Sequence, residues 1–124
     1  EVTEGAHAFL KLIERLGGYA SVARQKGSIF ASFDRADGGV ASAFQLWKNG
    51  VISISFKWLA NCGQLAHEDV RRSFYVRFSE SVGPMSSENI NGFPAFPAKL
   101  LVNSEVVVSV EPLMRELIEK AVAV

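Results

Sequence analysis

The sequence has few of the residues that cross-link a chain or bind a metal. Among its 124 residues there is one cysteine, Cys62, and there are two histidines. A single thiol cannot close a disulfide within the chain, so nothing points to an oxidising compartment. Two histidines and one cysteine cannot supply a zinc site on their own. We therefore expect no disulfide framework and no cofactor.

An excess of either charge is also missing. The chain carries 13 acidic and 13 basic residues. This balance argues against a dedicated nucleic-acid binder, which is usually basic, but leaves room for a local basic patch. No apolar run approaches the ~20 residues that a membrane span needs. The start has neither a methionine nor the basic region of a signal peptide. We expect a cytoplasmic protein with no membrane partner, of which this chain is a fragment.

The length predicts a single domain over residues 1–124. Apolar residues at 3.6-residue spacing predict helices, and β-branched or aromatic runs between turn residues predict strands. The predicted helices span 4–16, 65–80, 97–101 and 112–123, and the predicted strands span 28–33, 40–48, 51–58 and 105–110, with 19–27 as a connector. The predicted fold class is α+β, a three-stranded antiparallel meander with helices packed on one face, in the order α-β-β-β-α-(short α)-β-α.

Asn49-Gly50, between two apolar alternating runs, is the strongest hairpin signal in the chain. A two-residue type I′ turn there places Trp47 opposite Ile52 and sorts the two arms onto two faces. One face is nearly all apolar and is predicted to pack against the helices: Ala41, Ala43, Gln45, Trp47, Ile52, Ile54, Phe56 and Trp58. Gln45 is the only polar group on that face, and its burial would require a hydrogen-bond partner.

The order α-β-β-β-α-β resembles the core of restriction-endonuclease-like nucleases. That family has an acidic residue at the start of the second strand and an acid-x-Lys triplet on the third, which hold a divalent metal and position water. Asp37 and Lys57 match two of these positions, and Glu14 on the first helix would add a third group. Ser55 replaces the metal-binding acid, and a hydroxyl is a weak ligand for a hard dication. The resemblance therefore favours a relative that has lost catalysis over an active nuclease. The plain alternative makes Asp37 a turn residue and Lys57 a solvated lysine.

Cys62 and His67 are close enough in sequence to be considered as a thiol–imidazole pair. Such a nucleophile needs its base within hydrogen-bond reach and a third group that orients the base. No Asn or Asp is placed to be identified as that group. We therefore expect Cys62 to be a buried structural cysteine, and we predict no catalytic residue.

Basic residues gather in and near the second long helix. The candidate binding residues are Lys57, Arg71, Arg72 and Arg77, with Trp58 beside Lys57. Such a group suits phosphate contacts and base stacking, which makes nucleic-acid binding the alternative function. Glu68 and Asp69 precede Arg71 and Arg72 at the spacing of intrahelical ion pairs. For a chain with no net charge we favour ion pairing over nucleic-acid binding, so that these residues form a solvated face whose charges cancel.

The stretch ENINGFPAFPAKLL (88–101) resembles a segment of an uncharacterised bacterial domain with a Gly-x-Pro-x-x-Pro-x-x-Leu-Leu pattern. The residues that match this pattern are Gly92, Pro94, Pro97, Leu100 and Leu101. The strand-like 105–110 is an insertion relative to that domain. The resemblance implies an accessory module appended to larger proteins. In the same stretch, two Phe-Pro steps are expected to form a rigid wall that closes the core under Phe93 and Phe96.

We therefore predict a non-catalytic accessory or interaction domain. Its partner is expected to be another part of the parent protein or another protein, and a second copy of the chain is included among the candidates. Nucleic-acid recognition, as a degenerate nuclease fold, is the second hypothesis. A metal-dependent nuclease is the third.

Overall fold

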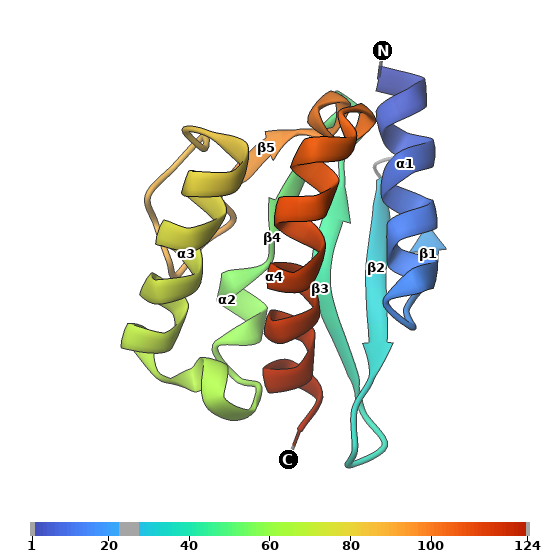
Figure 1. Ribbon diagram of the computed structural model, residues 1–124. Coiled ribbons are helices and arrows are strands. Elements are labelled where there is room, and N and C mark those ends of the chain that lie inside the picture. The colour runs from blue at the N-terminus through green and yellow to red at the C-terminus, as the bar shows by residue number, and fades with distance from the viewer. Residues whose placement is uncertain (1, 23–27, 124) are drawn as a thin grey trace.

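A computed structural model describes residues 2–22 and 28–123 (Figure 1). The described elements are α1 (Val2–Arg15), β1 (Tyr19–Val22), β2 (Ile29–Asp34), β3 (Val40–Leu46), β4 (Val51–Ile54), α2 (Phe56–Leu59), the 3₁₀ helix η1 (Gly63–Ala66), α3 (Glu68–Val82), β5 (Ala95–Pro97), the 3₁₀ helix η2 (Ala98–Val102) and α4 (Ser104–Val122). The long helices α1, α3 and α4 cover one face of a sheet, with α4 between the other two. The predicted α+β class is confirmed.

The described strands form one antiparallel sheet of five strands whose spatial order, β1-β2-β3-β4-β5, follows the chain. The predicted three-stranded meander is its centre, and β1 and β5 extend it at the two edges. β1 lies within the predicted connector 19–27, of which 23–27 are outside the described residues. Gly18 lets the chain enter β1 close to Phe33, because a Cβ on Gly18 would lie 2.3 Å from that ring.

The hairpin between β3 and β4 has a register one residue away from the predicted one. Leu46 pairs with Ile52, Trp47 N donates to Val51 O at 2.8 Å, and Gly50 N donates to Trp47 O at 2.9 Å. The turn therefore holds three residues, 48–50. Gly50 has a φ of 88°, and no described residue other than glycine has a positive φ. A type I′ turn needs a positive φ at Asn49 as well, so the prediction was wrong and a three-residue turn with a left-handed glycine replaces it.

The new register changes which side chains face the helices. Phe44, Leu46, Ile52 and Ile54 share the helix-covered face, and all four are buried. The Phe44 ring contacts Phe9 of α1 and Phe78 of α3, with centroids 6.5 and 6.4 Å apart. Gln45 and Ser53 pair on the opposite face of the sheet, which we call the outer face. Trp47 is also there, so the prediction that Gln45 and Trp47 pack against the helices is wrong, whereas Ile52 and Ile54 lie on the helix-covered face as predicted.

The sheet also differs from the prediction by a bulge in β3 and by an earlier end of β4. Ala31 pairs with Phe44 and Ser32 with Ser42, which leaves Ala43 as an extra residue of β3. Because of this bulge, Ala41 joins Phe33 on the helix side. The predicted strand 51–58 also ends at Ile54, after which the chain turns into α2.

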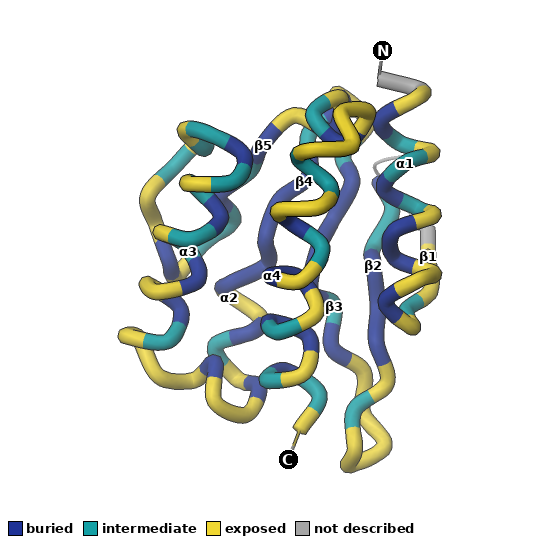
Figure 2. The backbone as a smooth tube through the Cα atoms, viewed as in Figure 1, coloured by how far each residue is buried: buried dark blue, intermediate teal, exposed yellow. Residues whose placement is uncertain are grey.

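α4 replaces two predicted elements. The predicted strand 105–110 and the predicted helix 112–123 form one helix, Ser104–Val122, with Pro112 inside it. Asn103 caps the helix, because its Oδ1 accepts a hydrogen bond from Glu105 N at 2.8 Å. Its buried side chains recur at helical spacing on both sides of the proline: Val110, Leu113, Met114, Leu117, Ile118 and Ala121. Figure 2 shows the same alternation of buried and exposed turns along α4.

The other predicted elements are close to their observed positions. The predicted helix 65–80 is observed as η1 and α3, with Phe74 and Phe78 buried. The predicted short helix 97–101 is η2. Phe96, in the edge strand β5, is buried as expected, whereas Phe93 is partly exposed. None of the helices in the described residues is long and apolar enough to cross a membrane.

Candidate binding surface

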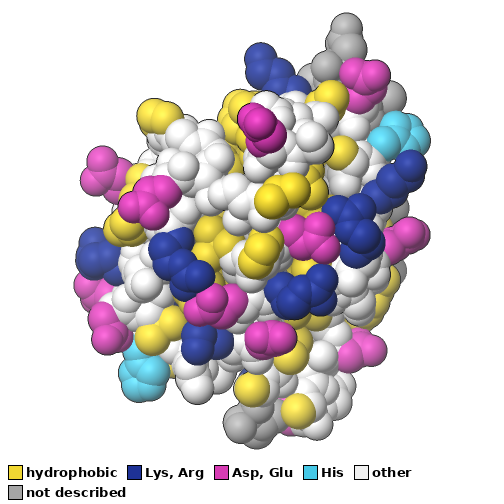
Figure 3. Space-filling model, in the orientation of Figure 1, with side chains coloured by type: hydrophobic (Ala, Val, Ile, Leu, Met, Phe, Trp, Pro, Cys, Tyr) yellow, Lys and Arg dark blue, Asp and Glu magenta, His cyan; other side chains and the backbone are white. Residues whose placement is uncertain are grey.

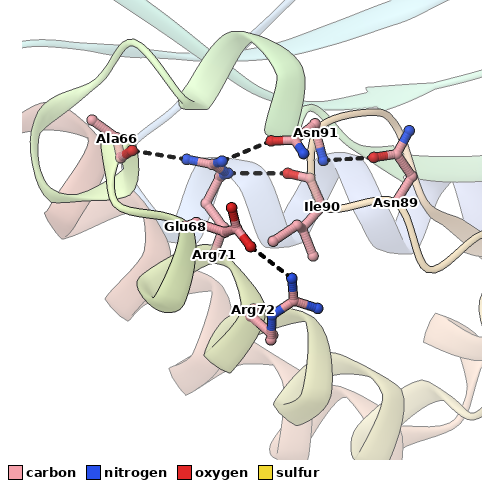
Figure 4. Close-up of polar contacts among 7 residues, drawn as sticks. All are labelled: Ala66, Glu68, Arg71, Arg72, Asn89, Ile90 and Asn91. Carbon is pink, nitrogen blue, oxygen red and sulfur yellow. Dashed lines mark hydrogen bonds and ion pairs between the residues drawn. The ribbon is translucent and has the colours of Figure 1, made fainter.

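Arg71, a predicted binding residue, is buried inside a ring of oxygen atoms. It lies in the first turns of α3, and 5% of it is exposed. Its Nε donates to Ile90 O at 3.0 Å, its Nη1 to Leu65 O at 2.8 Å and Ala66 O at 3.0 Å, and its Nη2 to Asn91 Oδ1 at 2.7 Å. Figure 4 shows the guanidinium directed into the fold between η1 and the loop 86–92. Arg71 therefore joins η1 to the loop before β5 and does not face solvent.

Arg72 is exposed and Arg77 is partly buried on α3, and each has an acidic partner. Arg72 forms the expected intrahelical pair with Glu68 at 2.8 Å. Arg77 donates to both carboxylate oxygens of Glu116 on α4, at 2.7 and 3.0 Å, and so ties the two helices together. Its hydrogen bond holds the pKa of Glu116 below the usual value, against the opposing effect of burial. Figure 3 shows acidic and basic side chains interspersed across this face.

The nuclease-like residues do not form a metal site. Asp37 is a turn residue, whose Oδ1 accepts from Gly39 N at 2.9 Å. The pairing of β3 with β4 does not extend to Lys57, because the last bond between the two segments runs from Ser55 N to Ala43 O, and Lys57 is exposed on α2. Glu14 lies on the exposed side of α1. Within the described residues, no three His, Cys, Asp or Glu side chains are grouped closely enough to hold a metal ion.

Cys62 is buried, as expected for a structural cysteine. Its Sγ lies 3.8 Å from Trp58 O, a weak hydrogen bond that fixes it to the end of α2. His67 is an exposed residue directly before α3.

Three aromatic rings form a row that includes Phe30 on the outer face. The ring centroids of Phe30 and Trp58 are 5.7 Å apart, and those of Trp58 and Phe93 are 5.2 Å apart. Phe30 belongs to β2 and Phe93 precedes β5, so Trp58 contacts rings from two segments that β3 and β4 separate in the sheet. It is held edge-on or tilted by a ring on each side, yet 40% of it is exposed. The arrangement is a preformed, solvent-accessible aromatic surface.

A pocket of about 370 Å³ adjoins this row. Its lining residues are Phe30, Val40, Ala41, Ser42, Trp58, Leu59 and Cys62. The lining contains two aromatic rings and one hydroxyl group, and none of these side chains carries a formal charge. Apolar walls with one or two polar groups are typical of pockets that bind an uncharged group.

The two indole N–H groups of the chain differ in their hydrogen bonding. Trp47 Nε1 donates to Ser53 Oγ at 2.9 Å. Trp58 Nε1 has no acceptor among the described residues, and Trp58 is one of the residues that line the pocket. Gln45, also on the outer face, has the partner its burial requires, because its Nε2 donates to Ser28 Oγ at 2.9 Å.

Sequence reasoning missed this surface for a physical reason. Its rings come from three separate segments, and only the strand register and the turn into α2 bring them together. The burial of Arg71 did have a signal, because it lies three residues before Phe74 and seven before Phe78, on the same helical stripe. Comparison with protein families, curated proteins and solved structures finds no match for this chain.

Proposed function

We propose that this chain is a non-catalytic interaction domain that binds a protein segment through the aromatic row and its pocket. One observation carries the proposal: Trp58 is fixed between Phe30 and Phe93, and 40% of it remains exposed. Tryptophan in such a position is the usual anchor of a protein interface, because it buries a large area at little cost in side-chain freedom. The partner belongs to the parent protein or to another cytoplasmic protein.

The pairing of the three arginines of α3 that the sequence predicts as binding residues favours a neutral partner. Binding of nucleic acid depends on cations that neutralise phosphates. Arg71 is enclosed by carbonyl and amide oxygens, and Arg72 and Arg77 are each paired with a carboxylate. The pocket lining itself has no cation. A partner that contributes an apolar side chain fits this lining better than a phosphate backbone does.

Single-stranded nucleic acid is the second candidate. One observation favours it: Lys57 precedes Trp58 on α2, and both are exposed. A lysine beside an exposed indole can bind a phosphate while a base stacks on the ring. Such binding would weaken strongly as salt rises.

A peptide selection tests the proposal. A phage-displayed library of random peptides is selected against the wild-type chain, and enriched peptides are then measured by fluorescence anisotropy against wild type, Trp58→Ala and Trp47→Phe. Trp47→Phe is the matched control, because that indole is occupied by Ser53. We expect peptides with an apolar anchor that lose at least tenfold in affinity with Trp58→Ala and less than twofold with Trp47→Phe.

Fluorescence anisotropy also tests the second candidate, single-stranded nucleic acid. Labelled 20-nucleotide single strands are titrated at 50 and 200 mM salt. Peptides that bind both variants equally, or no enrichment at all, would overturn the proposal. Strand binding that falls steeply with salt and is lost in Lys57→Glu would replace it with nucleic-acid recognition.

A further inference from the structure

We infer that the partner segment is rich in proline and binds in the polyproline II conformation. This inference rests on the proposed function and names the chemistry of its partner. Polyproline II is a left-handed helix with three residues per turn and no internal hydrogen bonds. Grooves lined by aromatic rings are the usual receptors for such segments.

The shape suits proline rings. Phe30, Trp58 and Phe93 follow one another at 5.7 and 5.2 Å, with interplanar angles of 59° and 77°. Rings that meet edge to face leave angled surfaces beside them. A proline side chain is a small, rigid apolar ring that packs against such surfaces. The pocket of about 370 Å³ lies at one end of the row, next to Phe30 and Trp58.

The hydrogen-bonding groups are complementary to the same ligand. The surface offers the free N–H of Trp58 and the hydroxyl of Ser42, whose Oγ is 3.5 Å from Ser32 Oγ. It offers no charged acceptor. A proline-rich segment has exposed backbone carbonyls, which carry the complementary partial charge, and proline has no backbone N–H that would need an acceptor. An ordinary extended peptide has backbone N–H groups, and the side chains of this lining offer few acceptors for them.

Little ordering is required on either side. Trp58 is already held by two rings, and the polyproline II helix forms before binding. Preorganisation of both partners lowers the entropy cost of association. A proline-rich segment therefore loses less conformational freedom on binding to this site than a flexible peptide of the same length does.

Titration of uniformly ¹⁵N-labelled chain with an N-acetylated decaproline peptide tests the inference. The two indole N–H signals are assigned with Trp47→Phe and Trp58→Phe. We expect the Trp58 signal to shift and the Trp47 signal to stay within the line width, because Trp47 already donates to Ser53. Trp58→Phe keeps an aromatic ring but removes the donor, and the dissociation constant is expected to rise about three- to tenfold, as for the loss of one hydrogen bond.

A second variant keeps the test independent of Trp58. Ser42→Phe fills the pocket while Trp58 stays in place, and it should abolish decaproline binding although both indole signals remain sharp and dispersed in the free chain. A flexible Gly-Ser decapeptide is the control ligand and should shift neither indole. Decaproline that leaves the Trp58 signal unmoved would overturn this inference. If selected peptides without proline still bound at Trp58, the proposed function would stand without this inference. If those peptides did not bind there either, the proposed function would also be overturned.

Discussion

Arg71 Nε donates to the carbonyl oxygen of Ile90 at 3.0 Å, and this bond joins α3 to a loop 19 positions further along the chain. The guanidinium serves three further acceptors, so its removal would leave buried oxygens without donors.

We predict that Arg71→Met lowers the free energy of unfolding by about 2–4 kcal/mol, because buried carbonyl groups lose their partners. Arg71→Lys should recover little, since an ammonium group cannot match the planar fork of a guanidinium. Urea denaturation followed by circular dichroism measures both. Arg72→Met, on the next residue, removes only an exposed ion pair and should cost less than about 0.5 kcal/mol. Equal losses at the two positions would contradict the buried role of Arg71.

The pair Arg77–Glu116 predicts a dependence of stability on acid. A carboxyl group whose pKa is lower in the folded chain stabilises it above the unfolded pKa, with an ordinary value of 4.5 for Glu116. That contribution is lost as the pH falls through the folded pKa. Both side chains are about two-fifths exposed, at 41% and 42%, so solvent screening limits the contribution to below about 1 kcal/mol.

Glu116→Gln should therefore lower the free energy of unfolding at pH 7 and make its decline between pH 5 and pH 3 shallower. Urea denaturation at pH 7, 5, 4 and 3 measures the effect. Glu119→Gln, an exposed substitution on the same helix, should leave the acid profile close to that of the wild type. Identical profiles for the two variants would rule out the ion pair as a source of acid sensitivity.

The conformation of the hairpin turn predicts different losses of stability for alanine substitutions at two neighbouring residues. Gly50 has a φ of 88°, whereas Asn49 has no positive φ. Gly50→Ala should cost about 1–2 kcal/mol because an L side chain is strained in the left-handed region. Asn49→Ala should stay within about 0.5 kcal/mol. Thermal denaturation of the two variants measures this, and a large loss for Asn49→Ala would instead favour the two-residue type I′ turn.

Pro112 predicts a stabilising substitution. It lies inside α4, is exposed, and cannot donate to the carbonyl group four residues earlier. Pro112→Ala should raise the free energy of unfolding by about 1–3 kcal/mol, because alanine restores that donor and suits the helix. Pro84→Ala, at an exposed proline outside any helix, should give no such gain. A decrease for Pro112→Ala would mean that the packing of α4 depends on the proline.

The sequence was most informative where a pattern extends over several turns. Phe9, Leu12 and Ile13 recur at helical spacing, and all three are buried in α1. The same spacing runs through α4 from Val106 to Ala121, but a local run of valines and a proline concealed it. Secondary structure from short windows fails at such places, because tertiary burial overrides local preference.

The register of the hairpin shows what local signals cannot decide. Asn49-Gly50 fits a two-residue turn and also the end of a three-residue turn. The two differ by one position, which is enough to exchange the faces of one arm. Burial of Phe44 and Ile54 against the helices selects the longer turn. The aromatic row depends on that choice, so it was beyond the reach of sequence patterns.

The order of strands has a consequence for how the chain assembles. Neighbours in the sheet are neighbours in sequence, so β1 to β4 can pair through short connections with a small loss of loop entropy. β5 joins the sheet only after α2, η1 and α3 have been traversed, between Ile54 and Ala95. Phe93 arrives with β5. During synthesis from the ribosome, the row of rings around Trp58 is therefore completed late, after the central hairpins have had time to form.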